Sequence, residues 1–331
     1  MRALGTSLGT SLGTSLGTRE TSVGLAIVAL SLLLAAVAPG FFARDNLADL
    51  FLANVPVLII ALGMTLIVLT GHIDISVGSM FACCAVASGV LAKAGVPMPL
   101  VLVASCALGA GFGFLNGALV ARVRIPSIVV SLATMIALRE GLRWATEGAW
   151  IQDLPADYQW LGVGAPVYPW LVLIAVVALQ AVFDWGLHKL PAGRAIYATG
   201  SSPQAARLAG IRVEVVTTAV FTVAGALVGL AALLNSVRFN QIPSNTGLGL
   251  ELKVIAAVVV GGTAITGGRG SVRGTLLGVV LLSAIGPALT FLGVTAYWER
   301  ALHGIIILAA VGADALRARP SLGKAAVGAA S

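Results

Sequence analysis

The chain has 331 residues, of which 58% are hydrophobic and only 10% are charged, and its mean hydropathy is +1.00. A soluble domain carries about 25% charged residues, so this composition excludes a soluble enzyme and, despite the formal net charge of +7, a nucleic-acid-binding domain. It is typical of an all-α, polytopic membrane protein. The three cysteines lie within apolar runs and the three histidines are far apart, so we predict neither a metal site nor a disulfide framework.

The chain begins with a low-complexity segment. Residues 5–18 read GTSLGTSLGTSLGT, a four-residue repeat that offers no long apolar face. We expect residues 1–20 to be disordered, or to be an extension upstream of the true start. Residues 21–316 are then the transmembrane domain, and residues 317–331 form a tail.

About ten membrane spans are predicted from the lengths of the apolar runs. They cover residues 22–42, 49–70, 75–92, 98–121, 126–145, 166–186, 214–235, 254–267, 274–294 and 301–316. The eighth and tenth are short for spans. With both termini in the cytoplasm, most loop arginines and lysines fall on the cytoplasmic side, as the positive-inside rule requires.

Two segments interrupt the apolar pattern with glycines, which gives two glycine-broken helix pairs. One lies within 250–276, where the run 254–260 ends in a cluster of glycines, and the other lies within 66–79. The two are similar, since Ile73, Gly78 and Ser79 match Ile265, Gly270 and Ser271. Broken helices survive in a membrane only against protein or water, and paired breaks indicate a transporter's substrate path. The predicted pathway glycines are Gly71, Gly78, Gly261, Gly262, Gly267, Gly268 and Gly270. Alternatively, the glycines let helices pack closely.

Polar residues within the spans are candidates for contact with a solute, because buried polar groups in membranes are usually functional. The candidates are Asp74, Ser76, Asn116, Thr263 and Thr266. Each has a structural alternative: Asp74 could cap the following helix, and Asn116 could join two helices.

One connecting loop, residues 187–213, contains the signals of a short helix outside the membrane. Ser202 is a suitable N-cap, Pro203 suits the first helical position, and Gly210 can end the helix. Either a docking surface for a cytoplasmic partner or an amphipathic surface helix would explain it.

Three separated motifs resemble the permease subunits of ribose-type ABC importers. They are TGHIDISVGS, GRAIYATGSSPQAARLAGI and VVVGGTAITGGRGSVRGTLLG, and the resemblance extends from about Asn46 to Ala315. The stretches WIQDLP (150–155) and NQIPSNTGLGLELKVIAA (240–257) are most similar to the autoinducer-2 and rhamnose branch.

The resemblance implies import of a monosaccharide or sugar-like solute, of the rhamnose, ribose or autoinducer-2 class, across the inner membrane. A second permease chain (as homodimer or heterodimer), two cytoplasmic ATPase subunits and a substrate-binding protein would complete the transporter. The segment that contacts the ATPase would include Gly193, Arg194, Tyr197, Gly200, Pro203, Ala205, Ala206 and Gly210.

The chain is expected to hydrolyse no ATP and to bind no cofactor itself. Its single Gly-Lys pair, Gly323-Lys324, lacks the rest of a phosphate-binding loop, so ATP would be used by the partner subunit. The alternative is an ion-coupled secondary transporter of a small polar solute, although the spans lack paired acidic residues for ion coupling.

Overall fold

The computed structural model describes residues 3–295, 298–299, 301–302, 304–306, 308 and 312. This part of the chain is all-helical, and its only strand-like pairing is an isolated bridge between Ile151 and Ile242. The helices are α1 (Ala3–Val37), α2 (Arg44–Leu69), α3 (Val77–Lys93), α4 (Met98–Ala121), α5 (Ser127–Thr146), α6 (Tyr168–Lys189), α7 (Pro191–Ser201), α8 (Pro203–Leu208), α9 (Val213–Ser236), α10 (Leu250–Val260) and α11 (Val272–Phe291). Two 3-10 turns, η1 (Pro39–Phe42) and η2 (Gln159–Gly162), join them.

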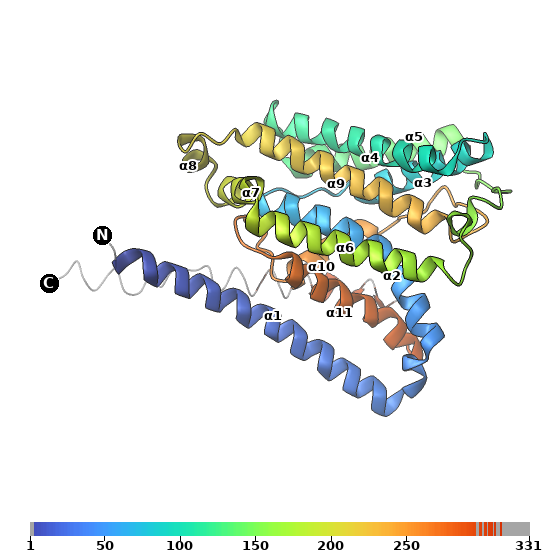
Figure 1. Cartoon of the computed structure of the whole chain (residues 1–331), viewed down its shortest axis with the longest axis horizontal. Coiled ribbons are helices and arrows are strands. Elements are labelled where there is room, and N and C mark those ends of the chain that lie inside the picture. Colours follow the sequence, from blue (N-terminus) through green and yellow to red (C-terminus); the bar gives the residue numbers. More distant parts are fainter. Residues whose placement is uncertain are drawn as a thin grey trace.

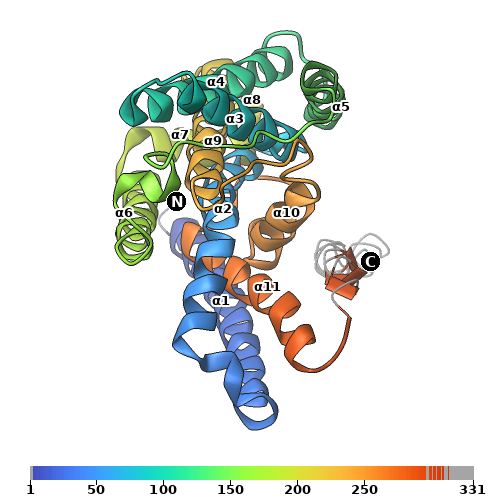
Figure 2. The same cartoon turned by 90° about the vertical axis from the view of Figure 1, so that its right-hand side faces the viewer.

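Helix α2 is the centre of the bundle. In its most apolar window 94% of the residues are buried, and it contacts α9, α10, α11 and α6 (Figure 2). A helix that is apolar all round can be buried all round, and the run from Val55 to Leu69 has that character. The other long helices surround α2 and expose apolar side chains outward, as expected where lipid is the solvent.

The closest helix pair is α4 with α9, and small residues explain the approach. Gly109, Gly113 and Gly117 of α4 lie directly against the α9 backbone, where a β-carbon would overlap its atoms. Ser105 at the same face donates a hydrogen bond of 2.8 Å to the Gly229 carbonyl. Small residues at such spacing let helices in membranes gain close van der Waals contact.

The bundle has two distinct ends. Helices α7 and α8 lie at one end, which we call the α7–α8 end (Figure 1). The loops 147–167 and 237–249 lie at the opposite end, here called the loop end. The Ile151–Ile242 bridge joins these two loops, with N···O distances of 3.0 and 2.9 Å.

The first nine predicted spans each overlap a helix, but not all of those helices are transmembrane by length and composition. Within the described residues six are long and apolar enough to cross a membrane, namely α1 from Glu20 onward, α2, α4, α6, α9 and α11, and α3 is a shorter apolar helix. Helix α5 carries Arg139, Glu140 and Arg143, which lower its hydropathy.

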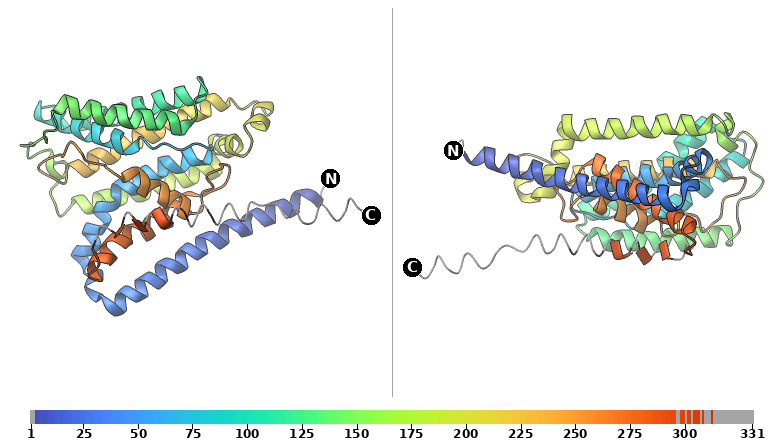
Figure 3. Two further views of the ribbon diagram at one scale, coloured as in Figure 1. Left: turned by 180° about the vertical axis from the view of Figure 1, so that it is seen from behind. Right: turned by 90° about the horizontal axis from the view of Figure 1, so that it is seen from below.

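Two expectations require correction. The predicted eighth span, 254–267, is wrong: α10 begins at Leu250 and ends at Val260, and 11 residues rise only about 16 Å. Most of the tenth, 301–316, and the tail 317–331 lie outside the described residues. Helix α1 begins at Ala3 and runs through the repeat at residues 5–18, where we expected disorder; leucine every fourth residue is close to the helical period. From Glu20 on, α1 lies beside α11 at the edge of the bundle (Figure 3).

Candidate solute pathway and coupling site

Three of the predicted pathway residues meet in one buried polar network. Asp74 Oδ1 accepts hydrogen bonds from the Ser76 backbone N–H at 2.8 Å and from its hydroxyl at 2.5 Å. Asn116 Nδ2 of α4 donates to Ser76 Oγ at 3.0 Å, and its Oδ1 accepts from the Thr134 hydroxyl of α5 at 2.7 Å. Asp74, Ser76 and Asn116 are each at most 2% exposed. The network therefore ties the segment 70–76 to α4 and α5.

This network contains both structural roles that the sequence left open. Ser76 is the N-cap residue of α3, and Asp74 holds its N–H in a local side-chain turn. Asn116 joins α4 to the same segment. Thr134 was missed, because a threonine within an apolar helix carries no signal that distinguishes it from a lipid-facing or packing residue.

The other two candidates lie in the second break, residues 261–271. Thr263 is fully buried, and its hydroxyl has no hydrogen-bond partner among the described residues. Thr266 is exposed. Within the described part of the chain neither hydroxyl bonds to the Asp74 network, so the five candidates fall into two groups.

The two breaks nevertheless touch each other. The Gly268 N–H donates to the Leu69 carbonyl at 2.9 Å, and Gly267 lies against the backbone of Gly71. Gly268 adopts a φ of +72°, a conformation that favours glycine, and a β-carbon there would come within 2.8 Å of Ser201 Cα. This position therefore requires glycine for two independent reasons.

Two of the seven predicted pathway glycines lie at close contacts between helices. Gly78 lies within α3, and a β-carbon on it would overlap the Gly247 carbonyl at the start of α10. Gly261 ends α10 with a φ of −63° and lies against Gly274 of α11. Gly78 is helical and Gly270 is not. The two breaks are therefore similar in sequence but differ in backbone conformation. The remaining five have positive φ: Gly71, Gly262, Gly267, Gly268 and Gly270.

Helix α7, which the sequence did not reveal as a helix, connects the loop 187–213 to the breaks. Gly200 contacts the Leu69 carbonyl and the Gly268 backbone so closely that a β-carbon would overlap both. The Tyr197 hydroxyl donates to the Gly270 carbonyl at 2.8 Å. Burial, with a further contribution from Asp184, raises the pKa of the Tyr197 phenol, so the hydroxyl stays protonated and remains a donor.

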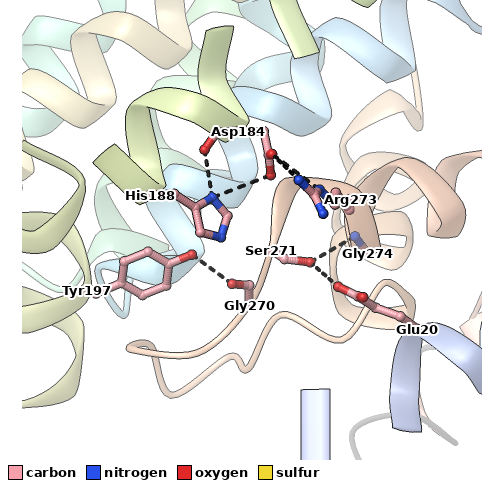
Figure 4. A network of polar contacts seen from close by, with 8 residues as sticks. All are labelled: Glu20, Asp184, His188, Tyr197, Gly270, Ser271, Arg273 and Gly274. Carbon is pink, nitrogen blue, oxygen red and sulfur yellow. Dashed lines mark hydrogen bonds and ion pairs between the residues drawn. The ribbon is translucent and has the colours of Figure 1, made fainter. Parts of the chain in front are cut away.

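Two further groups of polar contacts, among residues of α6, α11 and α1, lie near Tyr197 (Figure 4). Arg273 of α11 forms an ion pair of 2.9 Å with Asp184 of α6, beside His188. Ser271 caps α11 by accepting from the Gly274 N–H at 2.9 Å, and it donates to Glu20 at 2.6 Å. Helix α7 and the second break therefore form one connected unit.

Helix α8 has the boundaries that the sequence predicted. The Ser202 hydroxyl accepts from the Ala205 N–H at 3.3 Å, Pro203 occupies the first turn, and Gly210 follows the helix with a φ of +82°. Of the residues expected to contact the ATPase, Ala206 is only 3% exposed, whereas its neighbour Leu208 is 92% exposed. Ala205, Pro203 and Arg194 are exposed as well. Gly193 packs tightly against Leu187 at the α6–α7 corner.

Comparison with known proteins places these features in a family. The family described as "branched-chain amino acid transport system / permease component" matches residues 46–311. The autoinducer 2 import system permease protein LsrC of Escherichia coli (strain K12 / DH10B) is 38% identical over 300 residues, covering 88% of this chain and 85% of that protein. LsrC of Salmonella typhi is 37% identical over 292 residues, covering 88% and 84% respectively. No solved structure matches the chain.

Proposed function

Because the chain belongs to this family of transport-system permease components, we propose that it is the transmembrane subunit of an ABC importer for autoinducer 2 or a related sugar-like solute. The observation that carries the proposal is the 38% identity with an autoinducer 2 import permease across 88% of the chain. The rhamnose and ribose classes are the neighbouring possibilities, since all are small polyhydroxylated molecules.

The proposed transporter contains two permease chains, two ATPase subunits that bind and hydrolyse ATP, and a substrate-binding protein. We place the ATPase at the α7–α8 end, in the cytoplasm together with both termini. The exposed Leu208 supports this placement, because a partner docked on α8 would remove a leucine that is 92% exposed from water. The loop end would then face the substrate-binding protein.

Coupling would pass from the ATPase through α7 to the two breaks. A movement of α8 and α7 would displace the second break through the Tyr197–Gly270 hydrogen bond of 2.8 Å. It would displace the end of α2 through the contact between Gly200 and Leu69. Since packed interfaces change between discrete arrangements rather than deforming continuously, such contacts can transmit a step to the pathway.

We assign the solute path to the surroundings of the breaks. Asp74, Ser76 and Asn116 would hold the first break in shape and present polar groups to it, and Thr263 and Thr266 would do so at the second. The unpartnered hydroxyl of buried Thr263 supports a role that changes between states, because buried hydroxyls normally have a partner.

Reconstitution in liposomes tests the proposal. The permease with its ATPase and loaded binding protein should accumulate autoinducer 2 when ATP is supplied, and the permease alone should neither hydrolyse ATP nor accumulate solute. Uptake by the lone chain that is driven by a proton or sodium gradient would instead identify a secondary transporter.

A further inference from the structure

A pocket of about 530 Å³ opens at the loop end of the bundle, away from the breaks. The C-terminal end of α9 and the loop 237–249 form much of it, and Trp150 from the other loop, Ala53 of α2 and Ala85 of α3 also line it. Its volume falls within the range of about 300–1,000 Å³ that is usual for small-molecule sites.

The pocket is held in shape by contacts between the two loops. The Ile151–Ile242 bridge fixes the loops beside it, and the Trp160 N–H donates to the Val237 carbonyl at 2.7 Å. Arg139 of α5 donates to the carbonyl of Thr246, a lining residue, at 2.9 Å. The pocket is therefore a preformed site rather than a gap between independent loops.

The side chains around the pocket combine aromatic rings, amides and a guanidinium. Six of them line it: Trp150, Asn235, Arg238, Phe239, Asn240 and Gln241. Trp150 and Phe239 are each 48% exposed. Arg238 Nε is buried and has no hydrogen-bond partner among the described residues, which leaves one strong donor unsatisfied.

We propose that this pocket is a receiving site for one small, uncharged, polyhydroxylated solute at the loop end of the permease. The aromatic faces would cover the C–H groups of such a molecule, and the amides with Arg238 would exchange hydrogen bonds with its hydroxyls. The inference deepens the proposed function and rests on it: solute released by the binding protein would be held here before it reaches the breaks. A weak site is sufficient, because the solute must also leave.

Direct binding is measured on the permease alone in lipid nanodiscs, by the intrinsic tryptophan fluorescence on addition of autoinducer 2, L-rhamnose or D-ribose. We expect a saturable change with at least one of these probes. Trp150→Phe should abolish the change. Trp144→Phe should retain it, since Trp144 is 84% exposed on α5 and lies outside the pocket.

Transport by the complete assembly is measured with the variant Asn240→Ala/Gln241→Ala. Both side chains are exposed, so the fold should be kept. Loss of two solute hydrogen bonds should lower the maximal uptake rate by about tenfold, without changing the concentration of loaded binding protein that gives half-maximal uptake. Gln152→Ala, at an exposed position outside the pocket, is the matched control.

The outcomes separate this inference from the proposed function. Normal uptake by the double variant, with no fluorescence change for any probe in wild type, would overturn the receiving site and leave the importer assignment intact. A change only in the required concentration of binding protein would also overturn it, by making the pocket a docking surface. Failure of the wild-type assembly to transport would count against the proposed function itself.

Discussion

Leu208 and Ala206 lie two residues apart on α8, but we expect substitution by glutamate to affect folding differently at the two positions. Leu208 is 92% exposed and Ala206 is 3% exposed. Glutamate at position 208 would meet only solvent, so the free energy of unfolding should change by less than about 0.5 kcal/mol. Glutamate at position 206 would bury a carboxylate, which costs several kcal/mol, and should unfold α8 locally.

The effect of Leu208→Glu on ATPase binding follows from the burial of the leucine. A leucine side chain that becomes fully buried in a partner's cleft contributes about 1.5–3 kcal/mol, so its loss should weaken binding by roughly 10- to 100-fold. The added charge increases this loss, since it would be desolvated without a partner.

Binding of the purified ATPase to the permease in nanodiscs measures the effect, and the thermal midpoint of the permease measures folding. We expect Leu208→Glu to weaken binding at an unchanged midpoint, and Ala206→Glu to lower the midpoint. Leu248→Glu is the matched control, because Leu248 is 60% exposed at the loop end. Wild-type ATPase affinity in Leu208→Glu would refute our placement of the docking surface on α8.

Three further predictions concern the breaks. Gly268→Val should abolish transport while membrane insertion is retained. The φ of +72° and the contact with Ser201 exclude a β-branched side chain at this position. Normal uptake by the variant would show that the second break tolerates valine. Tyr197→Phe removes the 2.8 Å hydrogen bond to Gly270, so the solute imported per ATP hydrolysed should fall while ATPase affinity is kept; an unchanged ratio would exclude this bond from coupling. In a background without Cys83, Cys84 and Cys106, single cysteines at Ile75 and Thr266 should react with a soluble maleimide, and the rate should change when the ATPase is trapped with ATP. A cysteine at Leu32, which is 67% exposed on α1, should stay unreactive as a lipid-facing control; equal rates at all three positions would remove the breaks from the pathway.

The sequence predicted helix positions well where local signals determine them. Span 98–121 coincides with α4, because the apolar run is bounded by Pro97 and Arg122. The cap residues Ser202, Pro203 and Gly210 predicted α8 for the same reason. At α10 the predicted span 254–267 was too long, although the run 254–260 ends in the glycine cluster that begins at Gly261, and α10 ends at Val260. What the sequence could not show is that Gly261 lies against Gly274 of α11, a neighbour distant in sequence.

The same distinction, between local sequence signals and contacts between distant residues, applies to the candidate site. Asp74 and Asn116 could be selected because polar groups are rare in apolar runs, yet their meeting at Ser76 depends on how α4 packs. Residue type alone also could not orient α8: Ala205 and Ala206 have the same side chain, and only tertiary contacts decide that one is exposed and the other buried.

Helix α7 is the clearest case in which residues of the sequence can be interpreted only once the fold is known. Gly193, Tyr197 and Gly200 look like loop residues, because glycine disfavours helices. In the structure both glycines mark places where backbones nearly touch, Gly193 with Leu187 and Gly200 with Leu69. A larger residue at position 193 would separate α7 from α6, and one at position 200 would separate it from α2. The glycines that hid this helix from sequence analysis are therefore the residues that let it contact α6, the end of α2 and the second break.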